Sequence, residues 1–140
     1  MPYESKIIES SLVVTWSKPE LEDVASVVEA AKQLSLRLGK RVKYVAYIPD
    51  TLATPERPVR DAMTKSLGVL REYCEDVILV LEGTGFRQSI GRSVLAGIVF
   101  VSGKRGQIHI CADIDEAAAV APPAAIAHLR ERQAAVAKKP

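Results

Sequence analysis

The chain has 140 residues, of which 48% are hydrophobic and 26% charged, so it is long and apolar enough for one domain with a sizeable core. Nineteen basic and seventeen acidic side chains give a net charge of +2, and aromatic residues make up 5%, which argues against the basic face and the stacking platforms of a nucleic-acid-binding protein. The two cysteines, Cys74 and Cys111, are too few for a disulfide framework and are expected to be reduced, buried thiols.

No targeting or membrane segment is expected. Residues Met1–Ser11 lack a positively charged stretch followed by an apolar one, so they do not have the pattern of a secretory signal. The longest apolar run, Val94–Val101, is far shorter than the ~20 residues that a membrane-spanning helix needs. We therefore expect a cytoplasmic protein.

Two short strands are predicted at the start of the chain. Lys6–Glu9 and Leu12–Thr15 are rich in β-branched residues and flank the small polar pair Ser10-Ser11, which predicts a hairpin with a tight turn there. Trp16 ends the second strand and is expected to pack against the helix that follows. An exposed Trp16 would instead be a candidate anchor for a partner.

The segment after Trp16 predicts a clearly bounded helix. Ser17 and Glu20 have the spacing of a capping box, and Pro19 is compatible with a first helical turn. Gly39 is expected to end the helix. Apolar residues recur at helical spacing between these signals, at Leu21, Val24, Val28, Ala31, Leu34 and Leu38.

Two apolar runs indicate strands that are buried on both faces, Val42–Ile48 and Val77–Leu81. Asp50–Pro58 is expected to be a loop, in which Thr54-Pro55 offers a helix cap followed by a first-turn proline. A second helix is then predicted from the spacing of its buried residues, Val59, Met63, Leu67, Leu70 and Cys74.

A third helix is predicted after the turn that starts at Gly83. One helical face runs through Phe86, Ile90, Val94, Ile98 and Val101. The alternative interpretation makes Gly97–Ser102 a strand that forms a hairpin with the residues after it. The run Val94–Val101 is wider than one helix face needs, so it predicts either core or an exposed patch for dimerisation.

The last predicted strand is Gln107–Cys111, in which His109 should point to the opposite face from its two isoleucine neighbours. Asp113 and Glu116 can cap a short helix, which Pro122-Pro123 would end. Residues 124–138 are rich in alanine and predict a further helix, but their apolar stripe is thin, so this tail is expected to dock loosely or to fray.

This order predicts an α/β fold with a single mixed, mostly parallel sheet, an N-terminal β-hairpin and covering helices (ββαβαβαβα) over residues 1–121. Helices between successive strands imply right-handed crossovers and parallel neighbours, whereas the hairpin adds an antiparallel strand. Residues 122–140 form the predicted C-terminal tail.

The predicted order resembles that of the STAS domains, the fold of bacterial anti-sigma-factor antagonists, and especially their SpoIIAA-like branch. Leu12–Ser17 leading into Pro19–Val24 is similar to that branch's strand-then-helix opening, and Cys111–Ala117 is similar to the family's last strand and acidic-capped helix. The resemblance covers roughly residues 5 to 120. It implies a regulatory module that binds a protein partner, often a kinase-like anti-sigma factor, and that has no catalysis of its own.

The resemblance also implies a phosphorylated Ser or Thr just after the strand that follows the first long helix, where phosphate adds roughly −1.5 to −2 charge. The corresponding residues here are Asp50, Thr51 and Thr54, although no Ser-Gly-Leu follows the hydroxyl residue. The alternative interpretation makes Thr54 a helix cap and Thr51 an ordinary loop residue.

A candidate anion site is predicted at Gly83, Thr84, Gly85 and Arg87. Free amides at a helix start attract anions, and the arginine would add positive charge. A dinucleotide site is not indicated, because Gln88 replaces the third small residue and no Walker lysine follows. The alternative interpretation is a tight turn that needs a positive φ.

No metal, cofactor or catalytic residue is predicted, because no cluster has metal-ligand spacing and no nucleophile is paired with a base. The leading hypothesis is therefore the non-catalytic, STAS-like interaction module. The second is a small anion-binding protein or enzyme that uses Gly83–Arg87, and the third is a self-associating structural protein that uses Val94–Val101 and the tail. The partner set excludes nucleic acid and membrane and includes a protein or a second copy.

Overall fold

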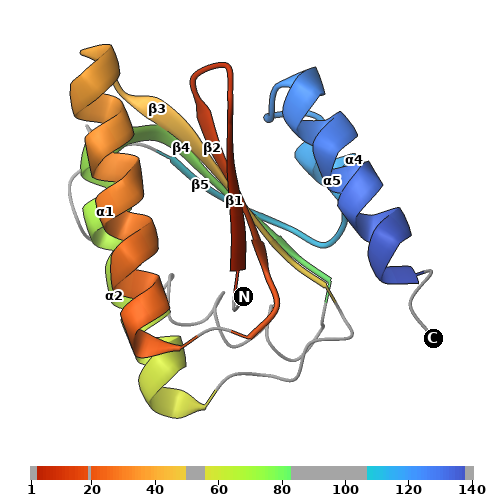
Figure 1. The fold of residues 1–140 in the computed structure, drawn as a ribbon, viewed down its shortest axis with the longest axis horizontal. Helices are drawn as coiled ribbons and strands as arrows, with labels where there is room; N and C mark the ends of the chain where they lie inside the picture. Colours follow the sequence, from red (N-terminus) through yellow and green to blue (C-terminus); the bar gives the residue numbers. More distant parts are fainter. Residues whose placement is uncertain (1–2, 19, 50–55, 83–106, 138–140) are drawn as a thin grey trace.

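The computed structural model describes residues 3–18, 20–49, 56–82 and 107–137, which form one five-stranded sheet with helices on both faces (Figure 1). The strands are β1 (Tyr3–Ile8), β2 (Ser11–Trp16), β3 (Val42–Ile48), β4 (Cys74–Leu81) and β5 (Gln107–Cys111). The helices are α1 (Leu21–Leu38), α2 (Arg57–Tyr73), α4 (Ile114–Ala117) and α5 (Pro123–Ala137).

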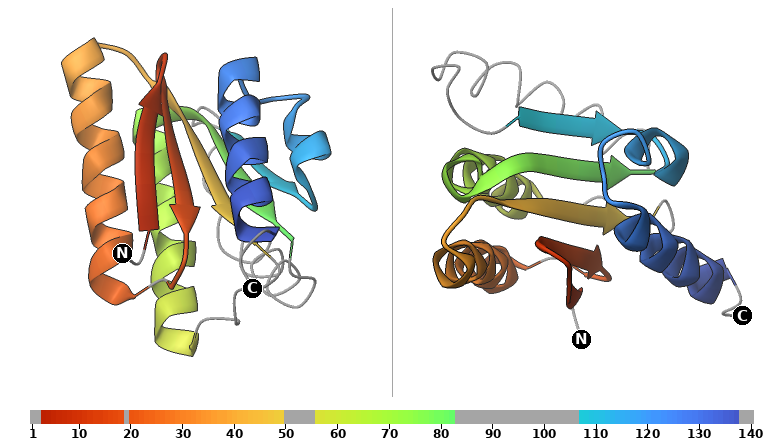
Figure 2. Two further views of the ribbon diagram at one scale, coloured as in Figure 1. Left: turned by 45° about the vertical axis from the view of Figure 1, so that its right-hand side comes forward. Right: turned by 90° about the horizontal axis from the view of Figure 1, so that it is seen from above.

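The strands lie in sequence order, β1-β2-β3-β4-β5, as the right-hand view of Figure 2 shows. β1 is antiparallel to β2, and β2 to β5 are parallel to their neighbours. The predicted α/β class with a mixed, mostly parallel sheet is confirmed. A sequential order with right-handed crossovers places the crossover helices on one face, which is where α1 and α2 lie.

Each face of the sheet has its own buried core. Residues of even number in β2 and β3, such as Val14 and Ala46, face α1 and α2, and Leu67 and Leu70 pack on them from α2. The intervening residues of these strands face α4 and α5. That second core contains Val13, Val45, Tyr47, Ile78, Val80, Cys111, Ile114, Ala117, Ala121, Ala125, Ile126 and Leu129.

The N-terminal hairpin is confirmed, but its turn is one residue earlier than predicted. Ile8 pairs with Ser11, so the turn is Glu9-Ser10 and not Ser10-Ser11. Glu9 adopts a φ of 57°, in the left-handed region that the tight turn requires. β1 begins at Tyr3, before the predicted Lys6, because pairing with β2 extends a strand whose own sequence is mostly polar.

Helix α1 ends where predicted, at Gly39 with a φ of 66°, but it begins at Leu21, later than the predicted cap at Ser17 implies. The predicted capping box is wrong, because the N-cap Glu20 is extended and makes no side-chain cap hydrogen bond. The buried stripe is also rotated from the predicted one. Leu21 and Leu38 are 53% and 42% exposed, whereas Val27 is buried in the core.

Helix α2 begins at Arg57 with Glu56 as the N-cap and Pro58 in the first turn. The predicted start at Thr54-Pro55 is therefore wrong. Cys74, predicted as the last residue of the helical stripe, instead begins β4 with an extended backbone. No glycine or proline marks this change in the sequence, and β4 consequently starts before the predicted Val77.

Arg41, the residue just before β3, makes contacts at this abrupt change from helix to strand. The Arg41 guanidinium donates a hydrogen bond to the carbonyl oxygen of Arg71, in the last turn of α2. It donates a second one to the carbonyl oxygen of Cys74 at 3.1 Å. The positively charged guanidinium therefore bridges a carbonyl in the last turn of α2 and the carbonyl of the residue at which β4 begins.

The C-terminal elements follow the prediction in part. β5 has the predicted bounds, and the Asp113 side chain caps α4 by accepting a hydrogen bond from the Glu116 amide at 2.8 Å. Pro122-Pro123 does not end this helix, because α4 already ends at Ala117 and Pro123 is the first residue of α5. Proline fits this first position since its missing N–H has no helical partner there.

Helix α5 is confirmed, but the loose docking expected of the tail is wrong. Ala125 and Leu129 have no exposed surface, and Ile126 is 7% exposed. All three pack in the second core against the sheet. None of the helices within the described ranges is long and apolar enough to cross a membrane.

Candidate functional site

The residues predicted as sites lie outside the part of the chain that the structure describes, and so do the alternative helix and strand predicted over 86–102. The predicted site residues are Asp50, Thr51, Thr54, Gly83, Thr84, Gly85 and Arg87. The described residues next to these two segments are paired, because the Glu82 amide donates to the Ile48 carbonyl oxygen at 3.2 Å. Ile48 and Glu82 therefore lie at neighbouring carboxyl ends of the sheet, the edge where open α/β sheets commonly bind ligands.

A polar cluster at this carboxyl edge ties the sheet to α5. The Tyr47 hydroxyl donates to Glu82 Oε1 at 2.8 Å, and Gln133 Nε2 donates to Glu82 Oε2 at 2.8 Å. Both carboxylate oxygens thus accept a hydrogen bond from the protein. No sequence pattern indicates this cluster, because Tyr47 lies in β3, Glu82 directly follows β4, and Gln133 lies in α5.

A second polar cluster lies at the amino edge of the same face. Asp76 in β4 is hydrogen-bonded through its Oδ1 to His109 Nε2 at 2.8 Å. The other carboxylate oxygen, Oδ2, lies 3.5 Å from Lys43 Nζ. Lys43 Nζ also donates to the Val120 carbonyl oxygen at 3.1 Å. The predicted orientation of His109, opposite to Ile108 and Ile110, is confirmed.

Neither cluster is combined with an activated nucleophile among the described residues. Burial raises the pKa of Cys74 to about 12, against the opposing effect of Arg41, and burial also raises the pKa of Cys111, which shares the face of His109. A thiol rather than a thiolate is a poor nucleophile. The described residues also contain no group of three His, Cys, Asp or Glu side chains arranged to hold a metal ion.

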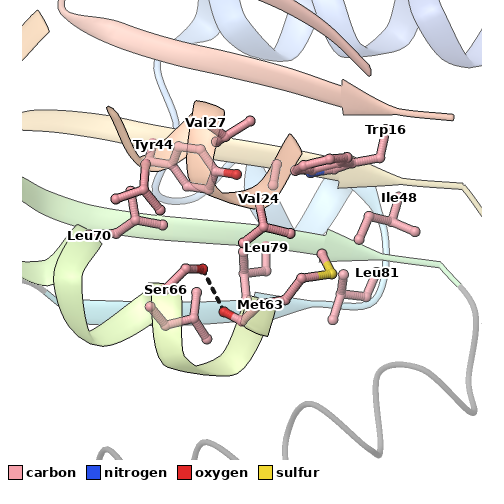
Figure 3. A pocket seen from close by; sticks show the side chains of 13 residues that line it. Trp16, Val24, Val27, Tyr44, Ile48, Met63, Ser66, Leu70, Leu79 and Leu81 are labelled. Carbon is pink, nitrogen blue, oxygen red and sulfur yellow. Dashed lines mark hydrogen bonds between the residues drawn. The ribbon is translucent and has the colours of Figure 1, made fainter. Parts of the chain in front are cut away.

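An apolar cavity of about 30 Å³ lies between the sheet and the two helices α1 and α2 (Figure 3). Trp16 lines it at 2% exposure beside Val24, which confirms that this tryptophan packs against α1. The indole N–H has no hydrogen-bond partner in the described part of the chain. Such a volume holds only one or two water molecules, far less than the roughly 300 Å³ or more of a typical ligand pocket.

Tyr44 also lines this cavity, and Figure 3 shows its hydroxyl directed toward Trp16. Burial raises the pKa of the Tyr44 phenol, and the nearby indole N–H opposes this rise without reaching normal hydrogen-bond geometry. The phenol therefore stays protonated near neutral pH. The cavity is a feature of the core and offers no group for acid–base chemistry.

An open groove of about 550 Å³ lies on the surface between β1 and α1. Ile7 and Leu36 line it and are 49% and 60% exposed. Its lining is Ile7, Ala30, Gln33, Leu34, Leu36 and Arg37. The sequence signal for the groove is Leu36, an apolar residue outside the buried stripe of its helix.

Comparison with known proteins gives no relative: no family profile, curated protein or solved structure matches this chain. The similarity to STAS domains therefore rests on the order of elements and stays a prediction. The α/β class with one mixed sheet is what the structure itself shows. A function has to be argued from the surfaces and contacts described above.

Proposed function

We propose that this chain is a non-catalytic interaction module of the STAS-like type, which binds a protein partner at the groove between β1 and α1. The observation that carries this proposal is the groove itself, where the exposed side chains of Ile7 and Leu36 lie beside Arg37. Grouped apolar side chains with a polar rim are typical of protein interfaces, and arginine is enriched among the residues that dominate binding energy.

The chemistry of the groove defines the partner it fits. Its floor is formed by Ala30 and the buried Leu34, and its rim carries the amide of Gln33 and the guanidinium of Arg37. A suitable partner places an apolar side chain between Ile7 and Leu36 and a carboxylate next to Arg37. Arginine binds a carboxylate through paired hydrogen bonds, which gives orientation as well as affinity.

The two polar clusters support a structural role rather than catalysis. Lys43 and Gln133 each form a contact between the sheet and the segment that contains α4 and α5, through the Val120 carbonyl and the Glu82 carboxylate. Both cysteines are free and buried with raised pKa values. The proposal places the module in the bacterial cytoplasm, where such thiols stay reduced.

The test is capture of a partner by the tagged chain from a lysate of its own source, compared with two matched variants. Leu36→Asp places a charge in the groove, whereas Val69→Asp places the same charge on α2 at a side chain that is 43% exposed. We expect a distinct protein to be retained by the wild type and by Val69→Asp and to be lost with Leu36→Asp. Equal capture by both variants, or no distinct protein with the wild type, contradicts the proposal.

A further inference from the structure

β1 is an outer strand of the sheet, and its free edge is exposed. Among the described residues it pairs only with β2, and its four central residues, Glu4 to Ile7, are all exposed. The right-hand view of Figure 2 shows the hairpin at the edge of the stack of strands. An edge of this kind presents unpaired N–H and C=O groups that a further strand can bind.

The register of the hairpin tells which backbone groups point outward. The hairpin closes on the pair Ile8–Ser11 across two residues, so that pair exchanges hydrogen bonds. Bonding alternates along an antiparallel pair, so the backbone groups of Glu4, Lys6 and Ile8 point toward β2. The backbone N–H and C=O groups of the alternate residues, Tyr3, Ser5 and Ile7, therefore point outward from the free edge, in the plane of the sheet.

The charges of β1 select one register for pairing with a second copy. The β1 strands of two antiparallel copies form backbone hydrogen bonds only when the residues whose N–H and C=O groups point outward lie opposite one another. Placing Tyr3 opposite Ser5 would put Glu4 against Glu4, and placing Ser5 opposite Ile7 would put Lys6 against Lys6. Placing Ser5 opposite Ser5 instead puts Glu4 opposite Lys6 twice and opposes Tyr3 and Ile7 twice.

We propose that two copies of this chain pair through β1, antiparallel and with Ser5 on the twofold axis, so that their sheets become one continuous sheet. All outward backbone groups from Tyr3 to Ile7 are then bonded. A lysine on an edge strand commonly prevents pairing, but here Glu4 of the second copy lies opposite Lys6 and removes that repulsion.

The side chains on both faces fit this arrangement. Tyr3 and Ile7 lie on the face of α1, where the Tyr3 ring is 5.3 Å from that of Trp16, so the second copy extends an apolar surface. Glu4 lies on the face of α5, and its side chain is 51% exposed although Arg132 lies 3.6 Å away. It therefore remains accessible to Lys6 of the second copy.

This inference goes beyond the proposed function, because it stands on the backbone and charges of β1 and not on the groove wall formed by α1. A chain that stays monomeric but still captures a distinct partner overturns only the pairing. A chain that pairs but captures no other protein overturns only the proposed partner.

The first experiment measures the dissociation constant of the full chain by sedimentation or light scattering for the wild type and charge variants. We expect a dimer for the wild type and an affinity weaker by on the order of tenfold for Lys6→Glu, because two like-charge pairs replace two opposite-charge pairs. Lys65→Glu, at an exposed lysine on α2, is the matched control and should bind as the wild type does.

Mixing tests the register itself. Glu4→Lys and Lys6→Glu should each dimerise poorly alone, yet they should form a heterodimer when mixed, since every pair then has opposite charges. The chain carrying both substitutions should dimerise as the wild type does. A monomeric wild type at all concentrations, or a dimer that is insensitive to Lys6→Glu, overturns the proposal.

A crosslink provides a second, independent test. Opposed residues in a hydrogen-bonded antiparallel pair have Cα atoms about 5.5 Å apart, within the range of a disulfide. Ser5→Cys should therefore form a disulfide-linked dimer on mild oxidation. Ile7→Cys, whose two copies lie far apart in this register, should not. Equal crosslinking of both variants overturns the register.

Discussion

The two faces of the sheet are covered by helices in different ways. The face under α1 and α2 has an apolar core with a small cavity, and the buried Trp16 indole N–H there lacks a partner among the described residues. The face under α4 and α5 has an apolar centre with a polar cluster at each end, around Asp76 and around Glu82. Among the described residues, the second face thus adds polar clusters between the sheet and its helices to the burial that both faces share.

The reason lies in the helices themselves. α1 has a wide apolar stripe that fixes which side faces the sheet, whereas α5 carries alanine on nearly every side. Burial alone therefore gives α5 little rotational preference. Leu129 and the hydrogen bond from Gln133 to Glu82 supply that preference, so directed contacts are found where the apolar pattern is weak.

The largest expected effect is at the centre of the second face. Leu129→Ala should lower the free energy of unfolding by about 3 kcal/mol, because it removes a fully buried side chain and leaves a cavity. Denaturant unfolding measures this change. Leu36→Ala, at a residue that is 60% exposed, is the control and should change stability by less than about 0.5 kcal/mol. A small cost for Leu129→Ala would show that α5 is not part of the core.

The same substitution, tyrosine to phenylalanine, can be made on each face of the sheet to compare the loss of stability. Tyr47→Phe should cost about 1.5 kcal/mol, because Glu82 loses a donor to its charged carboxylate. Tyr44→Phe on the other face should cost less than about 0.5 kcal/mol, since the Trp16 indole N–H beside its hydroxyl does not reach normal hydrogen-bond geometry. Equal costs in thermal or denaturant unfolding would remove the distinction between the faces.

Helix caps give a smaller contrast of the same kind. Asp113→Ala should cost about 1 kcal/mol, because the Asp113 carboxylate caps α4 through the Glu116 amide. Glu20→Ala should be close to neutral, because the Glu20 side chain makes no cap hydrogen bond at the start of α1. The difference in unfolding free energy between the two variants is the measurement. Its reversal would contradict the cap assignments.

The smallest effect is a pH dependence that comes from the second face. Burial lowers the pKa of His128, and Lys6 and Arg132 lower it further while Glu4 and Glu131 oppose them. Since the unfolded chain then binds the proton more readily, stability should fall as pH decreases below about 6.5, the ordinary value for histidine.

The comparison of wild type with His128→Gln isolates this effect from other groups. The wild type should lose more stability on acidification than the variant does, in denaturant titrations at a concentration where the chain is monomeric. A wild type that gains stability relative to the variant at acid pH would contradict the lowered pKa of His128.

Continuous apolar runs were sufficient to predict β3, and alternation was sufficient for β5, with the observed bounds. The start of β4 was missed because α2 passes into it at Cys74 without a glycine or proline, under contacts from Arg41 that only the tertiary structure provides. β1 was predicted too short because its Tyr3 end is held by pairing with β2 and not by its own polar sequence.

The polar clusters could not be predicted because each joins residues far apart in the chain. Lys43, Asp76 and His109 lie on three strands and meet only when the register of the parallel sheet is known. Polar residues near the amino ends of otherwise apolar strands were the available signal. The predicted phosphoacceptor and anion-binding segments lie outside the described residues, so they stay predictions.

The measurement that tests the open edge most directly is amide hydrogen exchange in β1 at low and high protein concentration. The amides of Glu4 and Lys6 point toward β2 and serve as internal references that are protected at both concentrations. We predict that the amides of Ser5 and Ile7 exchange freely in dilute solution and become protected at high concentration. Free exchange of Ser5 and Ile7 at every concentration would contradict pairing through this edge.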